Sequence, residues 1–157
     1  MNKNQVFVFL FFPLLVLSGC IFDDANSEDS DGVVLEVEIE SNDAGVPVSD
    51  GTSDQLIDAV LQSSSQFNWS EIEVKIRYEM DDGGNEAITC SQSDDAAGCS
   101  ISEGNGNSAW EQNEIITIAE NGLDICDSSN CSLLITIMLQ PENEPGIILH
   151  QNEVVVN

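Results

Sequence analysis

Basic residues are scarce in this chain. Its 157 residues include 3 Lys and Arg against 29 Asp and Glu, and the formal net charge is −26. A molecule with this charge repels the phosphates of nucleic acids and the head groups of anionic lipids. We therefore exclude nucleic acid as a partner, and also attachment to a membrane by charge alone.

Long apolar runs are also absent, except at the N-terminus. There Lys3 precedes an apolar run from Val6 to Leu17. A run of about twelve residues is too short to cross a bilayer as a helix, which needs about twenty. The pattern predicts a secretory signal peptide. A retained membrane helix is disfavoured, because Pro13 interrupts the run and acidic residues follow it closely.

The end of this run, Leu17-Ser18-Gly19-Cys20, resembles the lipobox of prokaryotic lipoproteins. In that family the chain is cut before the cysteine, and the cysteine thiol carries a diacylglyceryl group. The resemblance implies removal of residues 1–19 and lipidation of Cys20. Two acyl chains then hold the protein to the membrane, where one gives only marginal binding. An ordinary signal peptide followed by an unmodified cysteine is the alternative.

The cleaved chain is predicted to have two parts. Residues 20–32 contain Cys20 and an acidic stretch with few large apolar residues, which predicts a disordered tether. Residues 33–157 form the predicted domain, in which Lys75 and Arg77 are the remaining basic residues. We expect this domain on the extracellular side of the cell membrane or, in a cell with two membranes, in the periplasm or at the outer membrane.

Alternating apolar and polar residues predict that the domain is all-β. The segments with strand patterns are 33–40, 71–78, 86–90, 114–119, 131–140 and 147–156. Residues 54–62 instead place Ile57, Val60 and Leu61 on one helical face and predict a short helix, and residues 91–107 predict a long loop. We predict a single Ig-like β-sandwich of about six or seven strands with one short helix.

Beyond Cys20, the cysteines are Cys90, Cys99, Cys126 and Cys131. In an exported chain we expect them to form disulfides. A zinc site is the alternative, but the spacings are loose and no histidine lies beside them. We predict the local pairing, Cys90–Cys99 and Cys126–Cys131, because flexible or turn-forming residues separate the members of each pair. Crossed pairings would stabilise the fold more, but they need two separate loops to meet.

Acidic turns raise the alternative of a calcium-dependent adhesion or binding module. The candidate ligands are Asp81, Asp82, Asn85 and Glu86, with Asp94 and Asp95 as a second group. Neither group matches a complete calcium-loop pattern, and clusters of this size arise from composition in a chain with 29 acidic residues. We therefore predict no cofactor, with calcium as the alternative.

Catalytic motifs are missing from the sequence. The single histidine, His150, lies in a predicted strand, and no Gly-x-Ser-x-Gly elbow or phosphate-binding glycine loop is present. A secreted hydrolase that uses carboxylates is a further alternative, but no acidic pair stands out from the others. We predict that the protein is not an enzyme.

Some residues are candidates for contact with glycans. Sequons at Asn68 and Asn130 are candidates for N-glycosylation of an exported chain. Trp69 and Trp110 are candidates for a carbohydrate-stacking pair, although tryptophans beside predicted strands are more often part of a core. The predicted partners are the membrane, through the lipid, and a surface protein or a glycan.

Several motifs resemble the β-sandwich head of archaeal type IV pilin-like and archaellin-like surface proteins. They are Phe67–Ile72, Trp110 with Glu114-Ile115-Ile116, Glu120-Asn121-Gly122, and the Cys126 and Cys131 pair, which is similar to that of some marine relatives. The resemblance covers residues 67–157 and implies a surface-exposed, non-catalytic sandwich without assigning binding residues. Pilins keep their apolar N-terminal helix, whereas the lipobox here implies its removal. We predict a lipid-anchored cell-surface protein with a binding or structural role.

Overall fold

The computed structural model describes residues 36–80, 83–92, 98–127 and 130–157 of the chain. They belong to one compact unit, Leu35–Asn157. The strands are β1 (Ile39–Asp43), β2 (Gln55–Leu61), β3 (Phe67–Asn68), β4 (Ile72–Glu79), β5 (Asn85–Cys90), β6 (Gly98–Glu103), β7 (Ala109–Trp110), β8 (Ile115–Asn121), β9 (Cys131–Leu139) and β10 (Ile147–Val156). A short 3-10 helix, η1 (Trp69–Glu71), lies between β3 and β4. The predicted all-β class is confirmed.

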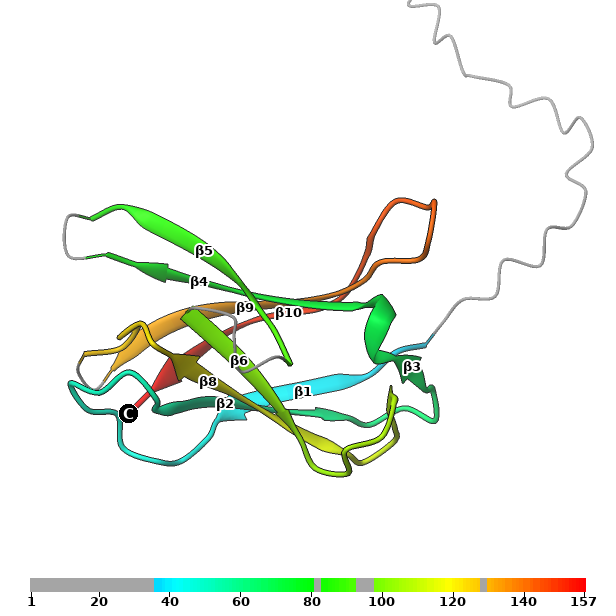
Figure 1. Cartoon of the computed structure of the whole chain (residues 1–157), viewed down its shortest axis with the longest axis horizontal. Helices are drawn as coiled ribbons and strands as arrows, with labels where there is room; N and C mark the ends of the chain where they lie inside the picture. The colour runs from blue at the N-terminus through cyan, green and yellow to red at the C-terminus, as the bar shows by residue number, and fades with distance from the viewer. Residues whose placement is uncertain (1–35, 81–82, 93–97, 128–129) are drawn as a thin grey trace, which may run out of the picture. The chain divides into compact units, whose positions relative to one another are not determined.

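The longer strands form two antiparallel sheets. Their orders are β1-β2-β8-β6 and β10-β9-β4-β5, and the short strands β3 and β7 pair separately. Figure 1 shows the two four-stranded sheets as layers, with β4, β5, β9 and β10 in one and β1, β2, β6 and β8 in the other. The predicted β-sandwich is therefore confirmed.

The inward faces of both sheets form the core. Ile116 and Ile118 of β8 and Val74 and Ile76 of β4 have no exposed surface. Because successive strand residues face opposite sides, these apolar side chains all point inward while their neighbours point outward. Burial of each contributes about 1.5–3 kcal/mol relative to exposure. The alternation that the sequence shows in these two strands is confirmed.

The sheets approach each other along both sides of the sandwich. On one side β5 lies beside β6, where the Ser91 N–H donates to the Cys99 carbonyl at 3.1 Å and the Ile101 N–H donates to the Ser91 carbonyl at 2.9 Å. On the other side β1 lies beside β10, where Asn152 Nδ2 donates to the Ser41 carbonyl at 3.2 Å. Edge strands of different sheets are thus joined on both sides.

The predicted helix over residues 54–62 is wrong, because this segment forms strand β2. Its pairing with β8 shifts register between Gln55 and Ile57, as a β-bulge does. The neighbouring Leu56 and Ile57 are both fully buried. Alternation is lost at this point, which made the spacing of the apolar residues look helical.

The predicted loop over residues 91–107 is wrong in part, because β6 lies within it. Apart from Ile101 its residues are small or polar, and pairing with β8 stabilises them as a strand. The sequence predicts a strand over residues 33–40. Among the described residues, strand pairing begins only at Ile39, the first residue of β1. With β6 and the short pair β3 and β7, the fold has more strands than predicted.

Candidate functional site

The structure contains two disulfides with the local pairing. Cys90 and Cys99, whose Cα atoms are 4.5 Å apart, join the end of β5 to β6 and thereby link the two sheets. Cys126 and Cys131, with Cα atoms 5.6 Å apart, join the segment before β9 to the first residue of β9. Because these thiols are bonded to one another, they are not available as zinc ligands.

The predicted calcium ligands are only partly described. Outside the described residues lie Asp81, Asp82, Asp94 and Asp95. Asn85 and Glu86 begin β5, and Glu86 Oε2 accepts a 3.0 Å hydrogen bond from the Tyr78 hydroxyl. Burial and this bond raise the pKa of Tyr78. Within the described ranges no group of His, Cys, Asp and Glu side chains is arranged to hold a metal ion. Calcium binding stays a prediction.

Two buried glutamates near the ends of β8 accept hydrogen bonds from loop backbones. Glu120 is 3% exposed, and its Oε1 accepts from the N–H groups of Ile125 at 2.7 Å and Cys126 at 2.9 Å. Glu114 is 5% exposed, and its Oε2 accepts from the Glu111 N–H at 2.9 Å. Burial raises the pKa of Glu120, and the N–H donors oppose that rise. Both carboxylates fix loops in place.

His150 lies in β10 and contacts the opposite sheet. Its Nε2 lies 2.8 Å from the hydroxyl of Ser41 in β1, and Asn152 Nδ2 donates to the same hydroxyl at 3.1 Å. Burial lowers the pKa of His150, so the neutral ring can accept the Ser41 proton. Ser41 is 4% exposed, which leaves a substrate no approach to its oxygen. The pair joins β1 to β10 and is not placed to act as nucleophile and base.

Trp69 and Trp110 form a stacked pair inside the fold. Their ring centroids are 5.9 Å apart and their planes meet at 19°. Trp69 is 8% exposed and Trp110 is fully buried, and Trp110 Nε1 donates to the Glu114 carbonyl at 3.0 Å. Since their faces are covered, these rings cannot stack on a carbohydrate. Both are core residues.

The two sequons lie in different surroundings. Asn68, at the end of β3, is exposed, and its amide donates to Glu71 Oε2 at 3.1 Å. Asn130 is exposed too, with a left-handed backbone at φ 69°, and it precedes the disulfide-bonded Cys131. Both asparagines are therefore at the surface, and glycan attachment stays a prediction.

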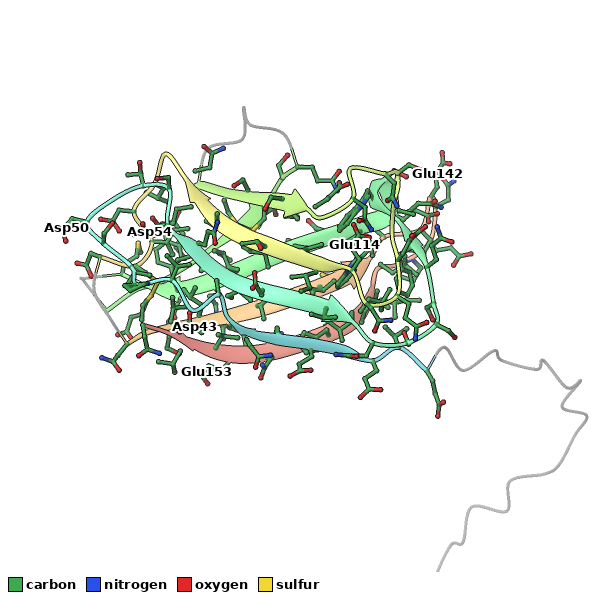
Figure 2. All side chains as sticks on the ribbon, turned by 90° about the horizontal axis from the view of Figure 1, so that it is seen from below. Asp43, Asp50, Asp54, Glu114, Glu142 and Glu153 are labelled. Atoms are coloured by element: carbon green, nitrogen blue, oxygen red, sulfur yellow. A yellow bond between two sulfur atoms is a disulfide. The ribbon has the colours of Figure 1, made fainter. Side chains whose placement is uncertain are left out.

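Acidic side chains are spread over the domain with little pairing. Figure 2 shows Asp50 and Asp54 near one end of the sandwich and Glu142 near the opposite end. In the part of the chain that the structure describes, the one salt bridge joins Lys75 Nζ to Glu73 Oε1 at 2.9 Å. The hydrogen bond and charge of Lys75 lower the pKa of Glu73, against a smaller effect of burial. Most of the negative charge is left without a cation.

A surface pocket of about 540 Å³ is present beside the second disulfide. Arg77 of β4 lines it together with Glu79, Asp127, Ser132 and Glu153. The sequence places Arg77 on the outer face of its strand, where the structure also has it. The pocket itself was missed, because its walls come from β4, β5, β9, β10 and the segment before β9, and several of these are far apart in the sequence.

Comparisons with known proteins add little to this geometry. No protein-family model matches the chain, and no curated protein matches it. Among solved structures, the archaellum periplasmic stator protein FlaG from Sulfolobus acidocaldarius matches 73% of this chain and 100% of its own, with 8% sequence identity and a TM-score of 0.41. The match is weak and carries no argument about function.

The described residues contain no helix of the length and apolar character that crossing a membrane requires.

Proposed function

We propose that the protein is exported and held to the cell membrane by lipid on Cys20, and that its acidic β-sandwich has a non-catalytic binding or structural role at the cell surface. The sequence Leu17-Ser18-Gly19-Cys20 carries this proposal. It follows an apolar run that is too short to span a bilayer, so a lipid is the available anchor.

Two features of the domain support the proposal. Disulfides form and persist in oxidising compartments, and Cys90–Cys99 and Cys126–Cys131 are both bonded. The Ser41 hydroxyl beside His150 is buried and already hydrogen-bonded, so the described Ser–His pair offers no nucleophile. An exported, non-catalytic role accounts for both observations.

Replacement of the proposed lipid attachment site tests the anchor. In the native host grown with a radiolabelled fatty acid, we expect the wild type to carry label and to require detergent for extraction. Cys20→Ala removes the thiol, so the variant is expected unlabelled, and either unprocessed or shed. Ser18→Ala keeps a small residue two positions before Cys20 and serves as the matched control, with label retained. A labelled, detergent-extracted Cys20→Ala protein overturns the proposal.

A further inference from the structure

The basic residues of the domain lie together on one strand but differ in their contacts. Lys75 and Arg77 both project from the outer face of β4. Lys75 is paired with Glu73 at 2.9 Å. Arg77 is exposed, and its guanidinium forms no hydrogen bond or salt bridge with the described residues. In a chain with 29 acidic residues, an arginine whose donors are unused is available for a ligand.

Arg77 faces a pocket that has the size of a small-molecule site. Its volume of about 540 Å³ lies within the usual range of roughly 300–1,000 Å³. The acidic residues Glu79, Asp127 and Glu153 also line it. Leu134, which pairs with Arg77 across β4 and β9, adds a partly exposed apolar surface. Donors, acceptors and an apolar patch therefore meet in one place.

Ile125 and Cys126, which line the pocket, are held by bonds within the fold. Cys126 is bonded to Cys131, the first residue of β9. From inside the fold, the buried Glu120 accepts the N–H groups of Ile125 and Cys126, at 2.7 and 2.9 Å. A wall held by a covalent bond and by buried hydrogen bonds loses little entropy on binding.

We propose that this pocket binds a neutral saccharide through its hydroxyl groups. Arg77 offers N–H donors in a planar fork, and the carboxylates of Glu79, Asp127 and Glu153 offer acceptors. A hydroxyl group donates and accepts, so neighbouring sugar hydroxyls satisfy both sets. Three carboxylates disfavour an anionic ligand, and an ammonium group cannot accept the N–H groups of Arg77, whereas a neutral hydroxyl can. The proposal rests on the pocket alone and stands or falls separately from the lipid anchor.

Charge-matched probes test the ligand class. The full-length protein, purified in detergent with both disulfides intact, is applied to an array of oligosaccharides that end in neutral sugars, uronic acids or amino sugars. Binding to at least one neutral set and none to the uronic acids is expected. Arg77→Gln is expected to weaken this binding about tenfold or more, because hydrogen bonds from a charged donor are lost.

Lys75→Gln is the matched control, since it removes the same charge from the same face of β4 but lies outside the pocket. It is expected to bind as the wild type does. Equal losses in the Arg77→Gln and Lys75→Gln proteins overturn the proposal, because they indicate a general effect of charge. The absence of binding to every neutral set, or a preference for uronic acids or amino sugars, overturns it as well.

Discussion

The two sides of the sandwich are joined by different chemistry. On the disulfide side, the Cys90–Cys99 bond links β5 to β6. On the polar side, Ser41 of β1 is hydrogen-bonded to His150 and Asn152 of β10. A covalent link holds whatever the protonation state, whereas a buried polar group is stable only while its partners remain in place. We therefore expect the two sides to respond differently to mutation and to pH.

The largest effect is expected on the disulfide side. The double variant Cys90→Ala/Cys99→Ala is predicted to lower the free energy of unfolding by about 2–4 kcal/mol, because the unfolded chain regains its freedom. Chemical denaturation measures the loss, and amide hydrogen exchange locates it. The variant Cys126→Ala/Cys131→Ala is the control, since it opens a shorter loop that does not join the sheets. Unchanged exchange in β5 and β6 of the first variant would contradict a cross-sheet role.

A smaller effect is expected on the polar side. Ser41→Ala removes the buried hydroxyl that contacts the half-buried His150 and the exposed Asn152, at a predicted cost of about 1 kcal/mol in unfolding free energy. Ser102→Ala is the matched control, because the Ser102 hydroxyl is exposed and donates to the Thr117 carbonyl at 3.3 Å. The loss of unfolding free energy in Ser102→Ala is expected to be no more than about 0.5 kcal/mol. Similar losses for both serines would show that the polar side contributes no more than an ordinary surface contact.

The smallest predicted effect is a pH dependence that His150 gives to the polar side. Burial lowers the pKa of His150 below 6.5 in the fold, so as the pH falls the unfolded chain takes up the proton first. Stability from this group is thus fully present above pH 6.5 and is lost as the pH falls through the folded pKa. The contribution of His150 is the difference between the unfolding free energies of the wild type and of His150→Gln, measured at several pH values between 8 and 5. A difference that does not change with pH contradicts the contribution of His150.

Much of the fold could be predicted because its central strands alternate cleanly. In β4 the inward Val74 and Ile76 and the outward Lys75 and Arg77 follow the two-residue period of a half-buried strand. β2 could not be recognised, since a bulge places both Leu56 and Ile57 in the core. β6 has little apolar surface of its own and depends on its pairing with β8.

The local disulfide pairing could also be predicted from short spacing and turn-forming residues, and the structure contains it. The contacts across the polar side could not, because 109 residues separate Ser41 from His150. The Arg77 pocket was missed for the same reason. Its walls become neighbours only when β4, β9 and β10 pair. Residue spacing describes local structure well and long-range contacts poorly.

The lipid anchor is tested most directly by the mass of the N-terminal peptide of the mature protein, isolated from membranes of the native host. We predict a peptide that begins at Cys20 and carries the added mass of a diacylglyceryl group on its thiol. A membrane-bound protein whose N-terminal peptide begins at Met1, or whose Cys20 carries no lipid, would contradict the proposed anchor.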